Sequence, residues 1–76
     1  MTPYKNLNGN SNVEAYELDD DSIVVRFMSG TYRNYLYNSV CPGSAVVERM
    51  KGLAIKGAGL NAYISTTVRS SFAKKW

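Results

Sequence analysis

A single cysteine, Cys41, and the absence of histidine limit the ways in which this chain can be stabilised. Small folds often add disulfides or a structural metal, because a chain of this length buries only roughly 60% of the surface that it exposes when unfolded. One cysteine closes no intramolecular disulfide, and one thiolate without histidine does not make a four-ligand zinc site. We therefore expect one small domain with an apolar core, for which an apolar fraction of 45% in 76 residues is sufficient. Self-association into a homo-oligomer stays open.

The same composition argues against an enzyme. Without histidine the chain lacks the usual general base near neutral pH and every Ser–His or Cys–His nucleophile pair. The acidic run Asp19–Asp21 lacks the alternating spacing and the distal glutamate of a calcium loop, so a solvated turn explains it better. We expect no catalytic residue, no metal site and no cofactor.

Three segments have the alternation of a β-strand. They are residues 13–18, 22–28 and 31–40, of which 22–28, with the sequence SIVVRFM, has the clearest period of two. Asp19–Asp21 separate the first two segments, and Ser29-Gly30 separate the second and third, where glycine allows the positive φ of a tight turn. This order predicts an antiparallel meander of three strands.

Two helices are expected after the strands. Pro42 ends the strand pattern, and Ser44 is placed to cap a helix that Gly57 interrupts. Residues 60–68 form the second helical pattern. The predicted fold class is thus α+β, with a three-stranded antiparallel meander followed by two helices packed on one face. The expected core includes Val25, Phe27, Val47, Met50, Leu53 and Ile64.

The chain divides by composition into three parts. Residues 1–10, rich in asparagine, are expected to be a flexible arm with little contribution to the core, 11–69 to be the folded domain, and 70–76 to be a basic C-terminal tail. No run of about 18 apolar residues occurs, and the N-terminus lacks the basic start and apolar middle of a signal peptide. We therefore expect a cytoplasmic protein without a membrane partner.

Several short motifs occur in an order typical of one family. Ser11–Val13 open the domain, an aromatic residue precedes a glycine turn at Phe27 and Gly30, and a Tyr-x-Tyr pair precedes a valine. A Lys-Gly pair is then followed by an apolar residue, an asparagine and an isoleucine. The residues of these last two motifs are Tyr35, Tyr37, Val40, Lys56, Gly57, Leu60, Asn61 and Ile64. In these features the chain resembles the KTSC domain, named for the C-terminus of some lysyl-tRNA synthetases and also free-standing in bacteria and phages.

The resemblance covers roughly three quarters of the chain and has two departures. Cys41 intervenes before Pro42, where the family has proline directly after the valine, and Leu60 stands where the family prefers phenylalanine. The resemblance implies a fold more firmly than an activity. RNA is the ligand that the family's attachment to a tRNA synthetase implies.

Charge is distributed unevenly along the chain. Residues 1–38 carry three basic and five acidic side chains, whereas residues 39–76 carry six basic side chains and one acidic one. Such a bias favours a polyanion or an acidic protein surface as partner. The candidate electrostatic contacts are Lys56, Arg69, Lys74 and Lys75, and Trp76 is a candidate anchor beside the last two.

Two further motifs each have a functional and a structural interpretation. Arg33, Tyr35 and Tyr37 share one face of the predicted third strand, where exposed rings would stack on unpaired bases, or the tyrosines lie in the core beneath the helices. The glycines of Lys56–Gly59 would let the backbone approach a phosphate, or they simply end one helix and connect it to the next.

These observations predict a small non-enzymatic binding module that engages RNA or another single-stranded nucleic acid through its basic C-terminal half. The alternative is a protein-interaction or inhibitory factor, for example one encoded by a phage or mobile element, that occupies a host protein surface.

Overall fold

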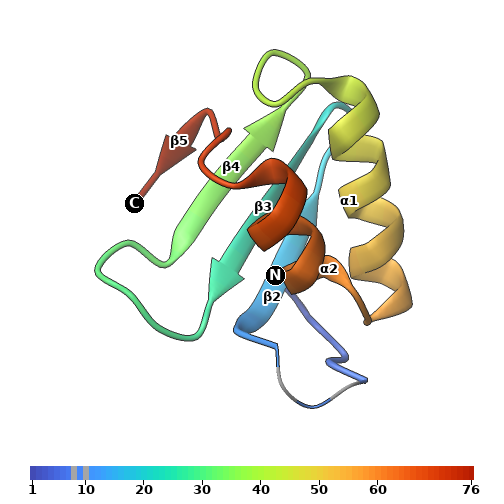
Figure 1. Cartoon of the computed structure of the whole chain (residues 1–76), viewed down its shortest axis with the longest axis vertical. Helices are drawn as coiled ribbons and strands as arrows, with labels where there is room; N and C mark the ends of the chain where they lie inside the picture. Colours follow the sequence, from blue (N-terminus) through green and yellow to red (C-terminus); the bar gives the residue numbers. More distant parts are fainter. Residues whose placement is uncertain (8, 10) are drawn as a thin grey trace.

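The computed structural model describes residues 1–7, 9 and 11–76. Its sheet has five antiparallel strands in the order β1-β2-β3-β4-β5, and the helices cover one face of it (Figure 1). A short π-helix, η1, continues α2 directly. The elements are β1 (Thr2–Pro3), β2 (Val13–Leu18), β3 (Ser22–Phe27), β4 (Asn34–Asn38), α1 (Ser44–Lys56), α2 (Leu60–Tyr63), η1 (Ile64–Val68) and β5 (Lys74–Lys75).

The α+β class is confirmed, and the number of strands is corrected from three to five. The three central strands are those expected, with β4 shorter than the predicted 31–40 because residues 28–33 form the connection from β3. The two added strands have two residues each and pair at the two edges of the sheet. Strands this short have no alternation to detect in a sequence.

The N-terminal segment contributes to the core, which corrects the expectation for residues 1–7. Tyr4 is 7% exposed and belongs to the main apolar cluster. Its backbone N–H donates to the carbonyl of Glu14 at 3.0 Å, and the N–H of Leu7 donates to the carbonyl of Gly57 at 2.8 Å. These contacts hold the segment against β2 and the end of α1. Asn8 and Asn10, also part of the predicted arm, lie outside the described residues.

The core lies between the sheet and the helices. Because side chains alternate along a strand, Ile23 and Val25 of β3 face the helices together with their register partners Tyr37 and Tyr35. Burial confirms four of the six expected core residues, whereas Phe27 and Leu53 are only partly buried and pack at its margin. The fully buried large side chains are Val13, Ile23, Val25, Tyr37, Val47, Met50 and Leu60.

Glycines bound α1 at both ends. Its N-cap is Gly43, with φ +116°, and no side chain caps the helix, so the expected cap by Ser44 is wrong: Ser44 is the first helical residue. At the C-terminal end, Gly57 has the left-handed φ of +82°, and its N–H donates to the carbonyl of Leu53. The connection Gly57–Gly59 then turns the chain into α2. No helix in the described part of the chain is long and apolar enough to cross a membrane.

Candidate nucleic-acid interface

An open groove of about 430 Å³ lies between the β3–β4 connection and the helical segment formed by α2 and η1. The sheet contributes aromatic side chains to it, and the helical segment contributes Asn61, Ile64, Ser65 and Arg69. No acidic residue is among those that line the groove in the described part of the chain. The aromatic lining residues are Phe27, Tyr32, Tyr35 and Tyr37.

Aromatic rings and a lysine are packed together at the edge of this groove. The ring centroid of Tyr35 lies 5.3 Å from that of Phe27 and 4.9 Å from that of Phe72, both in edge-to-face geometry. Lys75 pairs with Tyr35 across β4 and β5. Its Nζ lies 5.0 Å from the ring centroid of Tyr32 and 5.4 Å from that of Phe72, within cation–π range. An exposed ring therefore lies next to a positive charge at this edge.

Arg69 brings a second cation to the groove. Its N–H donates to the carbonyl of Ile64 at 2.5 Å, the i to i+5 bond that closes the π-turn of η1. Arg69 has a φ of +53°, which is uncommon for a residue other than glycine. Its side chain is exposed and lines the groove. π-turns and non-glycine residues with positive φ are both enriched at functional sites.

The two tyrosines of the Tyr-x-Tyr motif do not form an exposed stacking face. Tyr37 is 1% exposed, and desolvation by burial, with a smaller effect of Tyr35, raises the pKa of its hydroxyl well above the ordinary value. Tyr35 is half-buried between Phe27 and Phe72. The structural interpretation of this motif is therefore the correct one, because Ile23 and Val25 on the neighbouring strand draw the same face under the helices.

Arg33 lies apart from these tyrosines. It precedes β4, and its guanidinium reaches Glu14, with Nη2 2.7 Å from Oε1, while Nε donates to the carbonyl of Phe27 at 2.9 Å. The same carboxylate accepts from Arg26 at 3.5 Å. Since these groups are partly exposed, the pairs add little stability, but they hold Arg33 away from the face predicted for it.

The remaining basic candidates are also separated. Lys74 pairs with Leu36 and therefore lies on the sheet face opposite the helices, and Trp76 shares that face, with its ring centroid 5.7 Å from the Lys74 Nζ. Lys56 ends α1, and that end of the helix lies on the other side of the molecule from β5 (Figure 1). Of the predicted cations, the structure brings Arg69 into the lining of the groove and Lys75 over the ring of Tyr32, which lines it.

Sequence reasoning missed Tyr32 and Phe72. Tyr32 precedes β4, so the alternation of side chains along that strand does not predict where its ring lies. Phe72 was assigned to the tail. Its ring centroid lies 5.4 Å from the Lys75 Nζ, although a spacing of three residues does not place two side chains on one face of a strand.

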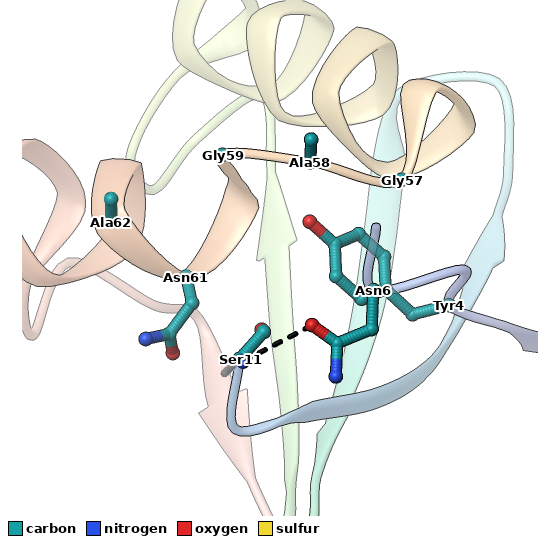
Figure 2. Close-up of a pocket in the computed structure, with 8 residues that line it drawn as sticks. All are labelled: Tyr4, Asn6, Ser11, Gly57, Ala58, Gly59, Asn61 and Ala62. Carbon is teal, nitrogen blue, oxygen red and sulfur yellow. Dashed lines mark hydrogen bonds between the residues drawn. The ribbon is translucent and has the colours of Figure 1, made fainter. Parts of the chain in front are cut away.

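A second, smaller cavity of about 190 Å³ lies at the Gly57–Gly59 connection. Figure 2 shows Tyr4 and Asn6 on one side of it, Asn61 on the other, and Ser11 between them, opposite the Gly57–Gly59 connection. Asn61 also lines the aromatic groove, so the two cavities are neighbours. The glycine motif singled out in the sequence therefore borders a polar pocket.

Comparison of the chain with protein-family models, curated proteins and solved structures found no match. The similarity to the KTSC domain stays a prediction that depends on the motifs themselves. Among the described residues, no group of three or more carboxylate or thiolate side chains is placed to hold a metal ion. The side chains that line the groove offer aromatic contact, hydrogen bonding and positive charge.

Proposed function

We propose that this protein is a non-enzymatic module that binds single-stranded RNA in the groove between the β3–β4 connection and η1. The observation that carries the proposal is the position of Lys75 over the rings of Tyr32 and Phe72, with Arg69 lining the same groove. Stacking of a base on an aromatic ring contributes about 1–3 kcal/mol, and nearby cations hold the phosphates.

The exposure of the groove residues supports this use. Tyr32 is 49% exposed, whereas most aromatic side chains of the chain belong to the core or pack against it. Its ring therefore offers a face to a ligand without unpacking the fold. Lys75 and Arg69 are exposed, and in the described part of the chain neither has a carboxylate within ion-pair distance. Their charge is thus available to a phosphate.

Adjacent lysines provide a matched test of the electrostatic part. Lys75→Gln and Lys74→Gln remove the same charge from neighbouring positions that face opposite sides of the sheet. In fluorescence anisotropy with short labelled RNA, Lys75→Gln is expected to reduce the slope of log affinity against log salt by about 0.7, the value for one phosphate contact. Lys74→Gln is expected to leave the slope unchanged. Equal effects of the two substitutions would contradict the assignment of the groove.

Tyr32 provides the test of stacking. Tyr32→Ala is expected to weaken RNA binding by about 5- to 150-fold at every salt concentration, since about 1–3 kcal/mol of stacking is lost without any change in charge. Tyr32→Phe retains the ring and is expected to bind as the parent does. Absence of binding at about 50 mM salt and tens of micromolar protein, where electrostatic contacts are strong, would eliminate the nucleic-acid function.

One observation favours the protein-interaction alternative. Trp76 is 48% exposed on the uncovered face of the sheet, where the half-buried Leu36 also lies. Tryptophan is enriched among residues that dominate protein–protein binding energy. If the protein acts on a host protein through this face, Trp76→Ala is expected to abolish capture of that protein from nuclease-treated lysate, while Tyr32→Ala leaves it intact.

A further inference from the structure

The small pocket at the Gly57–Gly59 connection is lined by four polar side chains, those of Tyr4, Asn6, Ser11 and Asn61. Asn6 Oδ1 accepts from the N–H of Ser11 at 3.1 Å, which leaves the Asn6 amide N–H groups. Ser11 Oγ accepts from the N–H of Val13 at 3.1 Å, which leaves its O–H. A ligand that accepts hydrogen bonds therefore has donors available among these side chains.

Tyr4 adds a buried donor to the same pocket. Its hydroxyl oxygen accepts from the N–H of Leu60 at 3.3 Å, and the side chain is 7% exposed. Figure 2 shows this hydroxyl directed toward the Gly57–Gly59 connection. The hydroxyl proton is not used in this hydrogen bond, in which the oxygen is the acceptor. The hydroxyl can therefore also donate to an acceptor in the pocket that Tyr4 lines.

The charge around the pocket favours an anion. No acidic side chain lines it in the described part of the chain. Lys5 packs against Gly57, since a Cβ added there would lie 2.5 Å from the Lys5 Cβ, and Lys56 precedes Gly57 in the chain. Both lysines are exposed, and neither has a carboxylate partner among the described residues. Hydrogen-bond donors among the lining residues, with two lysines next to lining residues in the chain, fit an oxyanion.

We propose that this pocket binds a phosphate group of RNA, next to the nucleotide whose base occupies the aromatic groove. The inference rests on the proposed function and adds a second subsite to it. Asn61 lines both cavities, so a base in one and the adjoining phosphate in the other would belong to one stretch of strand. The pocket supplies neutral donors and the lysines supply charge, whereas the groove supplies the stacking surface.

The two subsites give separate signals in a ¹⁵N NMR titration of the full chain with adenosine, 3′-AMP, 5′-AMP and inorganic phosphate. Adenosine is expected to shift the amide signals of Gly30 and Thr31 at the groove, and inorganic phosphate those of Ala58 and Gly59 at the pocket. At least one of the two nucleotides is expected to shift both sets. It should bind about tenfold or more tightly than adenosine, as expected from charge-assisted hydrogen bonds.

Variants on the two sides of the pocket test the mechanism. The double variant Lys5→Gln/Lys56→Gln is expected to remove most of the advantage of the nucleotide over adenosine, while Arg49→Gln, on the exposed surface of α1, leaves it unchanged. Tyr4→Phe is expected to reduce the response to phosphate, and Tyr63→Phe on α2 serves as its control. If Tyr4→Phe unfolds, the lysine variant still decides the question, because its side chains are exposed.

The outcomes separate this inference from the function on which it rests. If adenosine and both nucleotides shift only the groove signals, with equal affinity, the phosphate subsite is overturned while RNA binding in the groove stands. If phosphate and nucleotides shift only the pocket signals, the phosphate subsite stands and the groove is overturned. Absence of any shift at both places overturns both.

Discussion

Replacing Gly57 with alanine is expected to destabilise the fold more than any other single methyl addition in α1 or its connection. Gly57 has φ +82°, a left-handed conformation that costs an L-residue about 1–2 kcal/mol. The added Cβ would also lie 2.5 Å from the Lys5 Cβ. A Cβ is not the free end of a flexible side chain, so the backbone of the N-terminal segment has to move.

The structure sets the size of this effect. Movement at Lys5 weakens the hydrogen bond from Leu7 to the carbonyl of Gly57 and disturbs the adjacent, buried Tyr4. With about 1 kcal/mol for the hydrogen bond and the backbone strain included, the free energy of unfolding is expected to fall by about 2–4 kcal/mol. A chain of this length has a total of about 4–11 kcal/mol, so the loss is readily measured.

Urea denaturation followed by circular dichroism provides the measurement. Gly52→Ala is the matched control, because Gly52 lies inside α1 and a Cβ there meets no atom within 4 Å. It is expected to stabilise the fold by about 0.5–1 kcal/mol. Adding Lys5→Gly to Gly57→Ala removes the clashing Cβ and should recover part of the loss. If Gly57→Ala unfolds at the urea concentration of the parent, the packing of Lys5 on Gly57 is wrong.

Three further predictions concern the core and the chemistry of the chain. Because burial raises the pKa of Tyr37, its deprotonation favours the unfolded state above pH about 10. The free energy of unfolding should therefore fall by up to about 1.4 kcal/mol per pH unit in that range. Tyr37→Phe should remove this part of the slope in alkaline denaturation. Met50→Ala in the fully buried core should destabilise by about 2–5 kcal/mol in urea denaturation, whereas Phe27→Ala at the margin should cost about half as much; equal losses would contradict the assigned burial. A chelator or dithiothreitol should leave the melting temperature unchanged, and a shift with reductant alone would indicate a disulfide between two chains through Cys41.

The elements of the central fold follow from local patterns in the sequence. β2, β3 and α1 lie where period-two and period-3.6 patterns place them, because burial of one face of an element imposes its period on the sequence. Gly57 similarly predicts the end of α1, since few other residues adopt the left-handed conformation required there. These features depend on residues that are close in the chain, so the pattern of one segment is enough to predict them.

The candidate site depends on contacts between distant segments, which no local sequence pattern predicts. Lys74 and Lys75 are chemically identical in the sequence. Only their register against β4 places Lys75 beside the groove and Lys74 on the opposite face of the sheet. Tyr4 enters the core and lines the small pocket because β1 pairs with β2, although it lies in a segment with no apolar periodicity. The sequence by itself therefore determined which segments are strands and helices and which residues carry charge. Only the tertiary structure decided which of those residues meet, because pairing across distant segments is selected by the packing of the whole core rather than by any one segment.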